Sequence, residues 1–292
     1  MAAIRFSDRM RERMTLSFEV FPPKTEAGWK KLPGVIDDLV SFHPDYISCT
    51  YGAGGSNVGM NEAVLQLIGK KVTACTHFTC IAARKESVRE QLSRYLEEGI
   101  EHVLALRGDY PRGWSETGGE FDHASDLVHF IREEFGDRFE IAVAAAPGGH
   151  VECRSEDEDI SFLRLKQDLG ADYIITQLCY DLEHFKVWRD KLDKAGITIP
   201  IDVGIMPVLN KNAIIKMCLS MNGCSIPQPL AELISRHYND SEEDFRKYGI
   251  EYTTKMVYEY LALGINGVHF YSLNKADAVL EICRNCGLAY RK

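Results

Sequence analysis

An acidic residue lies in a stretch of sequence that otherwise has the pattern of a buried strand. Residues 15–21 read TLSFEVF, and two prolines follow, so Glu19 lies near the end of an apolar run. Charged side chains are rarely buried unless something pairs with them, so a half-exposed strand would explain this position. A carboxylic acid that donates a proton in a reaction would explain it as well.

Polar residues recur at the ends of other apolar runs of strand length. In chain order they are Thr50, His77, Arg107 with Asp109, His150, Gln177 with Asp181, Asn210, and Tyr271 with Asn274. A structural role could explain any one of them, since a single histidine is more often a hydrogen-bonded core residue than a catalyst. Their recurrence at the same end of every strand favours one shared site that includes Glu19.

The apolar runs alternate with segments of helical character, and this order predicts the fold. Strands that are apolar on both faces and alternate with helices indicate a parallel sheet. Eight of them without a G-x-G-x-x-G motif favour a single (β/α)8 TIM-type barrel over a doubly wound sheet. We expect strands within 15–21, 45–54, 72–80, 101–111, 140–150, 171–181, 199–208 and 267–275. We expect helices within 28–42, 61–71, 87–99, 124–136, 159–170, 183–196 and 253–264.

One domain is expected to span residues 1–292, with an inserted helical loop around 222–245. Because the carboxyl ends of barrel strands meet at one rim, the polar residues listed above would converge there. Glycine-rich turns at 51–56, 107–113 and 146–150 would let the backbone approach a ligand closely.

Composition excludes several classes of protein. The formal net charge is −9 and no Lys/Arg run is present, which argues against nucleic-acid binding. Neither a secretory signal nor an apolar stretch of about 18 residues is visible, so we expect a cytoplasmic protein that does not span a membrane. The nine cysteines lie mostly in apolar runs, as free thiols do in a reducing compartment. Cys283 and Cys286 have no second pair at zinc-site spacing, so no metal site is expected.

Taken together, the motifs resemble those of the methylenetetrahydrofolate reductases, which are flavoproteins of one-carbon metabolism and methionine biosynthesis. The matching segments run in family order from about residue 16 to 275: SFEVFPPKT, CTYGAGG, HFTC, ALRGDYP, ASDLV, VAAAPGGH, GADYIITQ, GIMPV and HFYSLN. The resemblance is to short, bacterial-type members that consist of the catalytic barrel alone. It implies an FAD-carrying barrel that reduces 5,10-methylenetetrahydrofolate to 5-methyltetrahydrofolate with NADH or NADPH.

The resemblance also implies roles for individual residues. Glu19 would be the general acid, and Asp109 would act beside both the flavin and the pterin of the folate. FAD would be contacted by Thr50, Tyr51, Ala53, His77, Arg107, Gly108, Asp109, His123, Ala124, His150, Asp159 and Lys166. The folate, which can carry a polyglutamate tail, would be contacted by Gln177, Asp109, Tyr271 and Lys275. A homo-oligomer is also expected.

The implied chemistry accounts for these residue types. The methylene carbon of the substrate becomes a hydride acceptor when its ring opens, and ring opening needs a proton on the leaving nitrogen. We expect Phe18, Val20 and Phe21 to surround Glu19 with apolar groups that favour its protonated form. A negative Asp109 would make the flavin a stronger hydride donor and would stabilise positive charge on the pterin.

The sequence departs from the bacterial pattern at His123, Ala146 and Met217, and it lacks a glutamine after GIMPV. The choice among NADH, NADPH and a protein electron donor therefore stays open. Two alternatives remain: a flavin- and folate-binding subunit that depends on a partner for electrons, and another flavin barrel such as a proline dehydrogenase.

Overall fold

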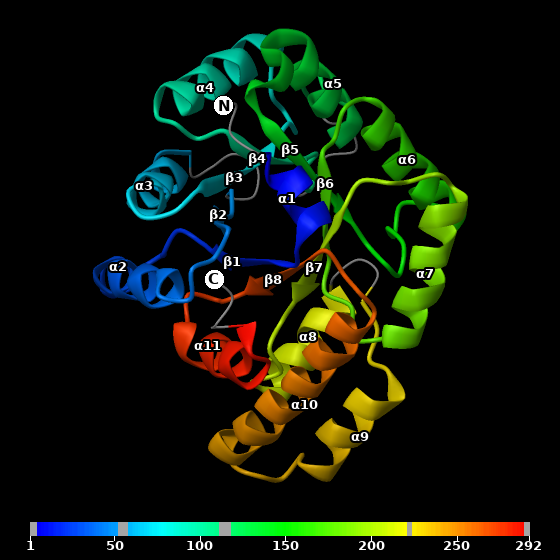
Figure 1. Cartoon of the computed structure of the whole chain (residues 1–292). Coiled ribbons are helices and arrows are strands. Elements are labelled where there is room, and N and C mark those ends of the chain that lie inside the picture. The colour runs from blue at the N-terminus through cyan, green and yellow to red at the C-terminus, as the bar shows by residue number, and fades with distance from the viewer. Residues whose placement is uncertain (1–4, 52–57, 111–117, 221–223, 289–292) are drawn as a thin grey trace.

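The computed structural model, which describes residues 5–51, 58–110, 118–220 and 224–288, contains a closed barrel of eight parallel strands. Each strand pairs with the next along the chain, and the last pairs with the first (Figure 1). The strands are β1 (Thr15–Val20), β2 (Tyr46–Cys49), β3 (Ala74–Thr79), β4 (His102–Leu106), β5 (Glu140–Ala145), β6 (Tyr173–Thr176), β7 (Ile201–Ile205) and β8 (Gly267–Tyr271). The predicted (β/α)8 barrel is confirmed.

Helices surround this barrel on the outside, as Figure 1 shows. Those that lie between successive strands or follow the last strand are α2 (Glu26–Val40), α3 (Val58–Gly69), α4 (Lys85–Glu97), α5 (Ala124–Phe135), α6 (Glu156–Asp168), α7 (Leu182–Lys194), α8 (Lys211–Ser220), α9 (Gln228–Arg236), α10 (Glu242–Ala262) and α11 (Ala276–Asn285). A short 3-10 helix, η2 (Gly136–Arg138), joins α5 to β5. The predicted helices all have counterparts here.

The segment between β7 and β8 differs in its details from the expectation. Three helices, α8, α9 and α10, occupy it, and α9 lies inside the range 222–245. The helix expected at 253–264 begins earlier, at Glu242, because the Ser241 hydroxyl accepts a hydrogen bond from the backbone N–H of Asp244 and caps the helix there.

Side chains alternate along each strand between the helical layer and the barrel interior. Phe18 and Val20 are fully buried in the outer layer, and the Phe18 ring stacks on Phe270 at 6.1 Å between centroids. Glu19 lies between them in sequence and therefore points the other way, into the barrel. The prediction that Phe18 and Val20 surround Glu19 is wrong for this reason. Phe21 has the parity of Glu19 and is half-buried.

An N-terminal helix that the sequence did not predict lies across the barrel (Figure 1). The helix α1 (Phe6–Glu12) places the ring of Phe6 5.0 Å from those of Tyr46 and Tyr173. The carboxylate of Glu140 accepts hydrogen bonds from the backbone N–H groups of Phe6 and Ser7. Its charged sequence hid this helix, because only two of its three buried residues, Phe6 and Met10, are apolar.

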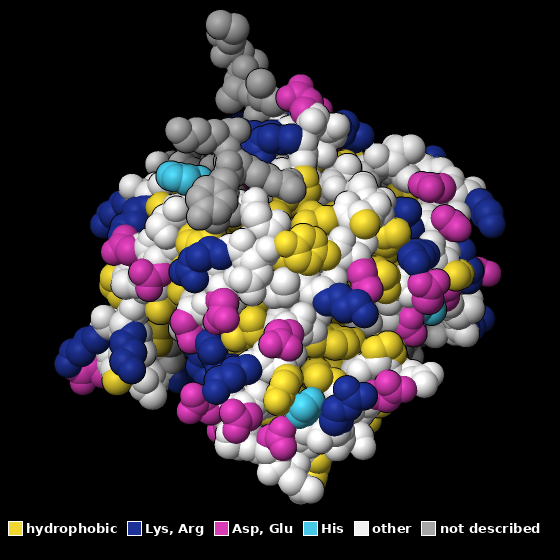
Figure 2. Space-filling view, turned by 60° about the horizontal axis from the view of Figure 1, so that its bottom comes forward, with side chains coloured by type: hydrophobic (Ala, Val, Ile, Leu, Met, Phe, Trp, Pro, Cys, Tyr) yellow, Lys and Arg dark blue, Asp and Glu magenta, His cyan; other side chains and the backbone are white. Residues whose placement is uncertain are grey.

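The surface carries charges of both signs. Figure 2 shows Lys and Arg side chains interspersed with Asp and Glu across the face it views, without an area of Lys and Arg alone. Within the described ranges, no helix has the length and apolar character needed to cross a lipid bilayer.

The contacts of Phe6 lead to a stability prediction. We expect Phe6→Ala to lower the free energy of unfolding by about 3 kcal/mol, because it leaves a cavity against Tyr46 and Tyr173. Urea denaturation followed by circular dichroism would measure the change. Val187→Ala is a suitable control, since Val187 is 54% exposed and its loss should matter by less than about 0.5 kcal/mol. A loss below about 1 kcal/mol for Phe6→Ala would mean that α1 contributes little to the core.

Candidate active site

The backbone of Glu19 is fixed by the strand that closes the barrel. Glu19 lies opposite Ser48 of β2 and Tyr271 of β8 in the strand register. Its carbonyl oxygen accepts hydrogen bonds from the backbone N–H of Ser272 at 3.2 Å and from the Ser272 hydroxyl at 2.5 Å. Asn274 uses its side-chain amide to bind both the N–H and the C=O of Phe21. The SFEVF and HFYSLN segments are therefore one structural unit.

The carboxylate of Glu19 lies between two histidines. Glu19 Oε2 is 3.3 Å from His77 Nε2 and 3.8 Å from His269 Nε2. Both histidines are buried, whereas the Glu19 side chain retains 16% of its exposure. Burial lowers the pKa of His77, and the charge of Glu19 opposes that shift only in part. A neutral His77 ring can donate to a Glu19 carboxylate or accept from its protonated form.

Below Glu19 the barrel interior holds further polar groups that the sequence analysis did not select. Asp202 and His269 are fully buried, and Ser17 lies between them within hydrogen-bonding distance of both. The available signal was the spacing: Ser17 and Glu19 are two apart on β1, so both face inward. His269 has the same relation to Tyr271 on β8.

Arg107, at the end of β4, is paired with an acid that the sequence analysis did not identify. Its guanidinium makes two hydrogen bonds to the carboxylate of Glu152, at 2.6 and 2.9 Å, and lies over the ring of Tyr110. Arg107 lowers the pKa of Glu152. Asp109, two residues after Arg107 in the sequence, is exposed at the same rim. Arg107 and Glu152 are 45 residues apart in the sequence, so spacing alone could not reveal that they pair.

Between Arg107 and Asp109, the backbone conformation requires glycine. Gly108 has φ +90°, a conformation that side chains rarely adopt, and a Cβ there would lie 2.9 Å from Ile81 Cγ2. The buried hydroxyl of neighbouring Thr79 has no hydrogen-bond partner among the described residues. The rim at β3 and β4 thus presents an unpaired polar atom beside a close turn.

The loop after β5 and the helix α6 bring another group of predicted residues to the rim. The ammonium of Lys166 donates a hydrogen bond to the carbonyl of Ala144, near the end of β5. Burial lowers the pKa of Lys166, while Asp159 on the same helix face acts to raise it. His150 Nδ1 accepts a hydrogen bond from the backbone N–H of Glu152 at 3.3 Å.

A cavity of about 780 Å³ opens beside this loop. The loop glycines Gly148 and Gly149 and the ring of His150 line it, with His184 and Asp181 from the start of α7. His184 was not selected from the sequence. In the structure its Nε2 lies 2.9 Å from Oε1 of Glu156, which lines the same cavity.

Apart from Asp109, the residues expected to contact the folate lie at or just after the ends of β6 and β8. Tyr271 donates its hydroxyl proton to the carbonyl of Thr176 at 2.7 Å, and burial raises the pKa of that hydroxyl. Gln177 follows Thr176 in the sequence and is half-buried. Its side-chain oxygen accepts a hydrogen bond from the backbone N–H of Leu178. Lys275 is exposed at the start of α11.

The remaining predicted cofactor contacts have different surroundings. Thr50 is half-buried at the end of β2, and its N–H donates to the carbonyl of Val20. The Tyr51 hydroxyl donates to Gln91 of α4, so it engages the helical layer and not the barrel opening. Ala53 lies outside the described residues.

At α5, His123 precedes the helix and Ala124 is its first residue. The ring of His123 stacks on Phe162 of α6 at 6.0 Å between centroids. Its backbone N–H donates to the carboxylate of Asp126, which fixes the start of the helix.

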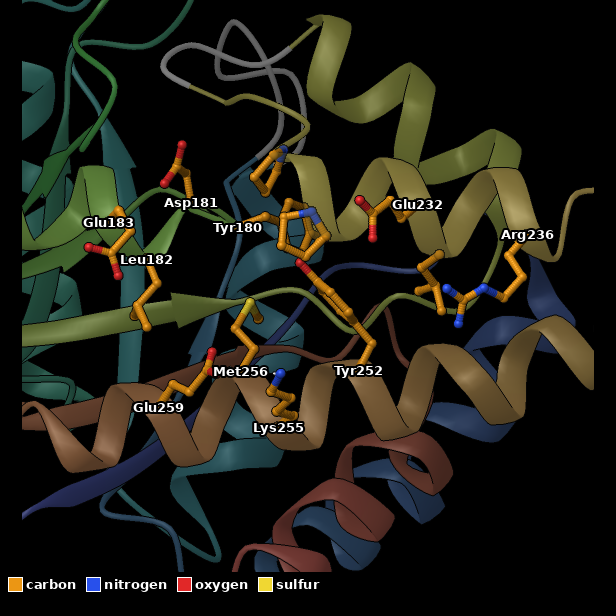
Figure 3. A pocket seen from close by; sticks show the side chains of 13 residues that line it. Tyr180, Asp181, Leu182, Glu183, Glu232, Arg236, Tyr252, Lys255, Met256 and Glu259 are labelled. Carbon is orange, nitrogen blue, oxygen red and sulfur yellow. Dashed lines mark ion pairs between the residues drawn. The ribbon is translucent and has the colours of Figure 1, made fainter.

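A second cavity, of about 440 Å³, has only Asp181 in its lining from the polar residues expected at the rim. Figure 3 shows it between the loop after β6 and the helices α9 and α10, with Asp181, Glu232, Arg236, Lys255 and Glu259 among its side chains. None of the residues assigned to cofactor or substrate lines it.

Comparison with known proteins shows which family the chain belongs to. The family model for methylenetetrahydrofolate reductase matches residues 5–287. A Zea mays protein named methylenetetrahydrofolate reductase (NADH) 1 is 36% identical over 290 residues, covering 94% of this chain and 49% of its own length. The 5,10-methylenetetrahydrofolate reductase of Pectobacterium carotovorum is 36% identical over 279 residues, covering 94% of this chain and 91% of its own.

A solved structure from Clostridium thermocellum, described as binding two copies of 5-methyl-5,6,7,8-tetrahydrofolic acid, has a TM-score of 0.66 and 14% identity. The match covers 98% of this chain and 99% of the solved chain. At 14% identity it supports the fold alone. The chain spans about half the length of the fungal and plant relatives that it matches. Since the family model matches nearly all of the sequence, the chain belongs to the methylenetetrahydrofolate reductase family.

Proposed function

We propose that this protein is an FAD-dependent enzyme that reduces 5,10-methylenetetrahydrofolate to 5-methyltetrahydrofolate with a pyridine nucleotide. The reaction proceeds in two half-reactions at one site, so that the nucleotide leaves before the folate is reduced. The observation that carries the proposal is the position of Glu19, which projects into the barrel between two buried histidines in a chain of this family.

Glu19 acts as the general acid in this proposal. It holds a proton at Oε2 and donates it to the leaving nitrogen of the folate, which opens the ring and leaves the carbon ready to accept hydride. His77 Nε2 lies 3.3 Å from that oxygen and has no hydrogen-bond partner among the described residues, so it is available to the carboxylate in one tautomer and to the protonated acid in the other. The backbone bonds of Ser272 hold the acid in place.

The residues at the rim fit FAD. Arg107 and Lys166 offer two cationic groups, the turn at Gly108 allows close approach of backbone, and the Thr79 hydroxyl is an unpaired donor. FAD, when bound, would carry a hydride from the pyridine nucleotide to the folate. Further contacts are assigned to Thr50, Tyr51, Ala53, His77, Asp109, His123, Ala124, His150 and Asp159 by the family motifs.

Gln177, Tyr271 and Lys275 are proposed to bind the folate. Gln177 and Tyr271 lie close together because Tyr271 bonds the carbonyl that precedes Gln177. Lys275 is an exposed cation at the same end of the barrel and suits the glutamate part of the substrate.

NADH is the proposed reductant, and the naming of the Zea mays relative supports it. Of the departures from the bacterial pattern, Ala146 is small and buried, and Met217 packs against the core. Anaerobic stopped-flow spectroscopy of the FAD-loaded protein would test the proposal, by comparing bleaching by NADH and by NADPH and then reoxidation by methylenetetrahydrofolate. A protein that neither nucleotide bleaches would contradict it.

We expect Glu19→Gln to slow the folate half-reaction by ~10²- to 10⁴-fold, because the amide cannot supply the proton. Bleaching by NADH should proceed at the normal rate, since it needs no acid at this position. Stopped-flow measurement of both half-reactions separates these effects. Glu97→Gln, on the exposed face of α4, serves as the control. Near-normal folate reduction by Glu19→Gln would remove Glu19 from its role.

We expect Asp109→Asn to raise the midpoint potential of bound FAD, because a negative charge beside the cofactor disfavours its reduction. The folate half-reaction should slow at the same time. Equilibrium dye reduction would measure the potential, with Asp38→Asn on the outer helix α2 as the matched control. An unchanged potential would show that the charge of Asp109 does not act on the cofactor.

A further inference from the structure

A line of buried polar groups runs through the barrel interior from β7 to Glu19. Asp202 Oδ2 accepts a hydrogen bond from the Ser17 hydroxyl at 2.8 Å and another from the Tyr46 hydroxyl at 2.8 Å. Ser17 Oγ is also 2.7 Å from His269 Nδ1. On the other side of the ring, His269 Nε2 is 3.8 Å from Glu19 Oε2. Hydrogen bonds thus join Asp202 to His269 through the Ser17 hydroxyl, and His269 lies within ion-pair distance of Glu19.

The directions of these bonds determine which nitrogen of His269 carries a proton. A serine hydroxyl has one hydrogen, and Ser17 donates it to Asp202. The Ser17 oxygen can then only accept from His269, so Nδ1 carries a hydrogen. In the neutral ring, Nε2 is therefore an acceptor, 3.5 Å from the Ser48 hydroxyl and 3.8 Å from Glu19 Oε2. Asp202 orients His269 through Ser17 much as a buried aspartate orients a catalytic histidine.

The burial of these polar groups costs free energy of folding wherever a polar atom lacks a partner. Ser17, Asp202 and His269 each have at most trace exposure, and Asp202 Oδ1 has no hydrogen-bond partner among the described residues. Burial raises the pKa of Asp202 to about 6, while His269, Tyr46 and Ser17 act to lower it. The carboxyl is therefore mostly ionised above pH 7, and a buried negative charge lies below the ring.

We propose that Asp202, Ser17 and His269 are positioning residues that keep a proton available to Glu19. The inference rests on the proposed role of Glu19 as general acid. The negative charge of Asp202 favours the state in which His269 Nε2 and Glu19 Oε2 together hold one proton. Glu19 therefore regains a proton readily after it has donated one.

The proton balance is simple. In one form of the pair, His269 is an imidazolium and Glu19 a carboxylate; in the other, His269 is neutral and Glu19 is protonated. Passing between them breaks the Nε2–H bond of His269 and forms an O–H bond on Glu19 Oε2, and no electrons are transferred. Donation to the folate removes this proton, and water replaces it through the partly exposed Glu19 when the site is open.

Other ionisable groups face this chain, and each is either neutral or paired with groups of opposite charge. They are His77, Tyr46, Tyr173, Tyr271, Cys49, Cys75 and Asp45. Burial raises the pKa values of the tyrosines and cysteines and lowers that of His77, so these groups are neutral at pH 7. Asp45 is paired with Arg9 and Arg13, at 3.1 and 2.6 Å.

The test is the pH dependence of the folate half-reaction in the FAD-loaded full chain. We expect Asp202→Asn to move the pH at which the rate falls downward by about one unit, which lowers the rate about tenfold on the alkaline side. The difference from the unsubstituted protein should vanish below about pH 6, where Asp202 itself is protonated. His269→Gln should lose rate at all pH values above 6, and bleaching by NADH should be unaffected in both variants.

His102→Gln is the matched control. His102 is a further histidine on a barrel strand, and its ring stacks on Tyr46 at 6.4 Å, as that of His269 does at 5.7 Å. It lies at the other end of the barrel, so its loss should leave the pH profile in place. A shift as large in His102→Gln as in Asp202→Asn would reduce the effect to core packing and overturn the proposal.

A measurement without cofactor supplies a second criterion. In ¹⁵N NMR spectra of histidine-labelled protein, with His269→Gln identifying the resonance, we expect a protonated Nδ1 at His269. Ser17→Ala, which removes one oxygen only, should change that tautomer and move the pH profile in the direction of Asp202→Asn. A bare Nδ1 in the unsubstituted protein would overturn the proposal even if the larger substitutions fail to fold.

The outcomes also separate this inference from the proposed function. If Glu19→Gln keeps the folate half-reaction, the general acid itself is wrongly assigned. If Glu19→Gln abolishes it while Asp202→Asn and Ser17→Ala keep the original pH profile, only the buried chain lacks the role proposed here.

Discussion

The pairing of the first strand with the last is the constraint on which the site depends. Glu19 and Ser272 are 253 residues apart, yet the Ser272 hydroxyl bonds the carbonyl of Glu19, and Asn274 bonds the backbone of Phe21 in the same way. Closing a barrel leaves each strand with two neighbours, so no strand edge stays free to slip in register. The direction of the Glu19 side chain is therefore set by the whole ring of strands.

The alternation of side chains along the strands divides the molecule into two different interiors. Leu16, Phe18 and Val20 pack outward in the layer beneath the helices, where the hydrophobic effect stabilises the fold. Ser17, Glu19 and their neighbours face a narrow interior in which polar groups must find partners or cost free energy. Asp202 Oδ2 and His269 Nδ1 find their partners in Ser17 and Tyr46, which is why the polar interior forms a connected network.

At the rim, the cations are engaged with partners in the protein. Arg107 binds Glu152 and lies over Tyr110, and Lys166 binds the carbonyl of Ala144. An anionic ligand there would exchange one charged partner for another, and the Arg107 fork is suited to such an exchange because its geometry is rigid. The same pairing holds the β5–α6 loop against the end of β4 and so shapes the cavity lined by Gly149 and His150.

The sequence by itself determined the strand–helix alternation, the barrel and the rim position of Glu19, because these depend on local periodicity and on motifs. It did not reveal α1, whose two apolar contacts are hidden among charges, or the pairing of Arg107 with Glu152, which joins distant loops. It also misjudged the surroundings of Glu19: adjacent residues on a strand point to opposite faces, so its neighbours in space are His77 and His269 and not Phe18 or Val20. Only closure of the barrel decides which inward side chains meet, since that depends on the register of all eight strands.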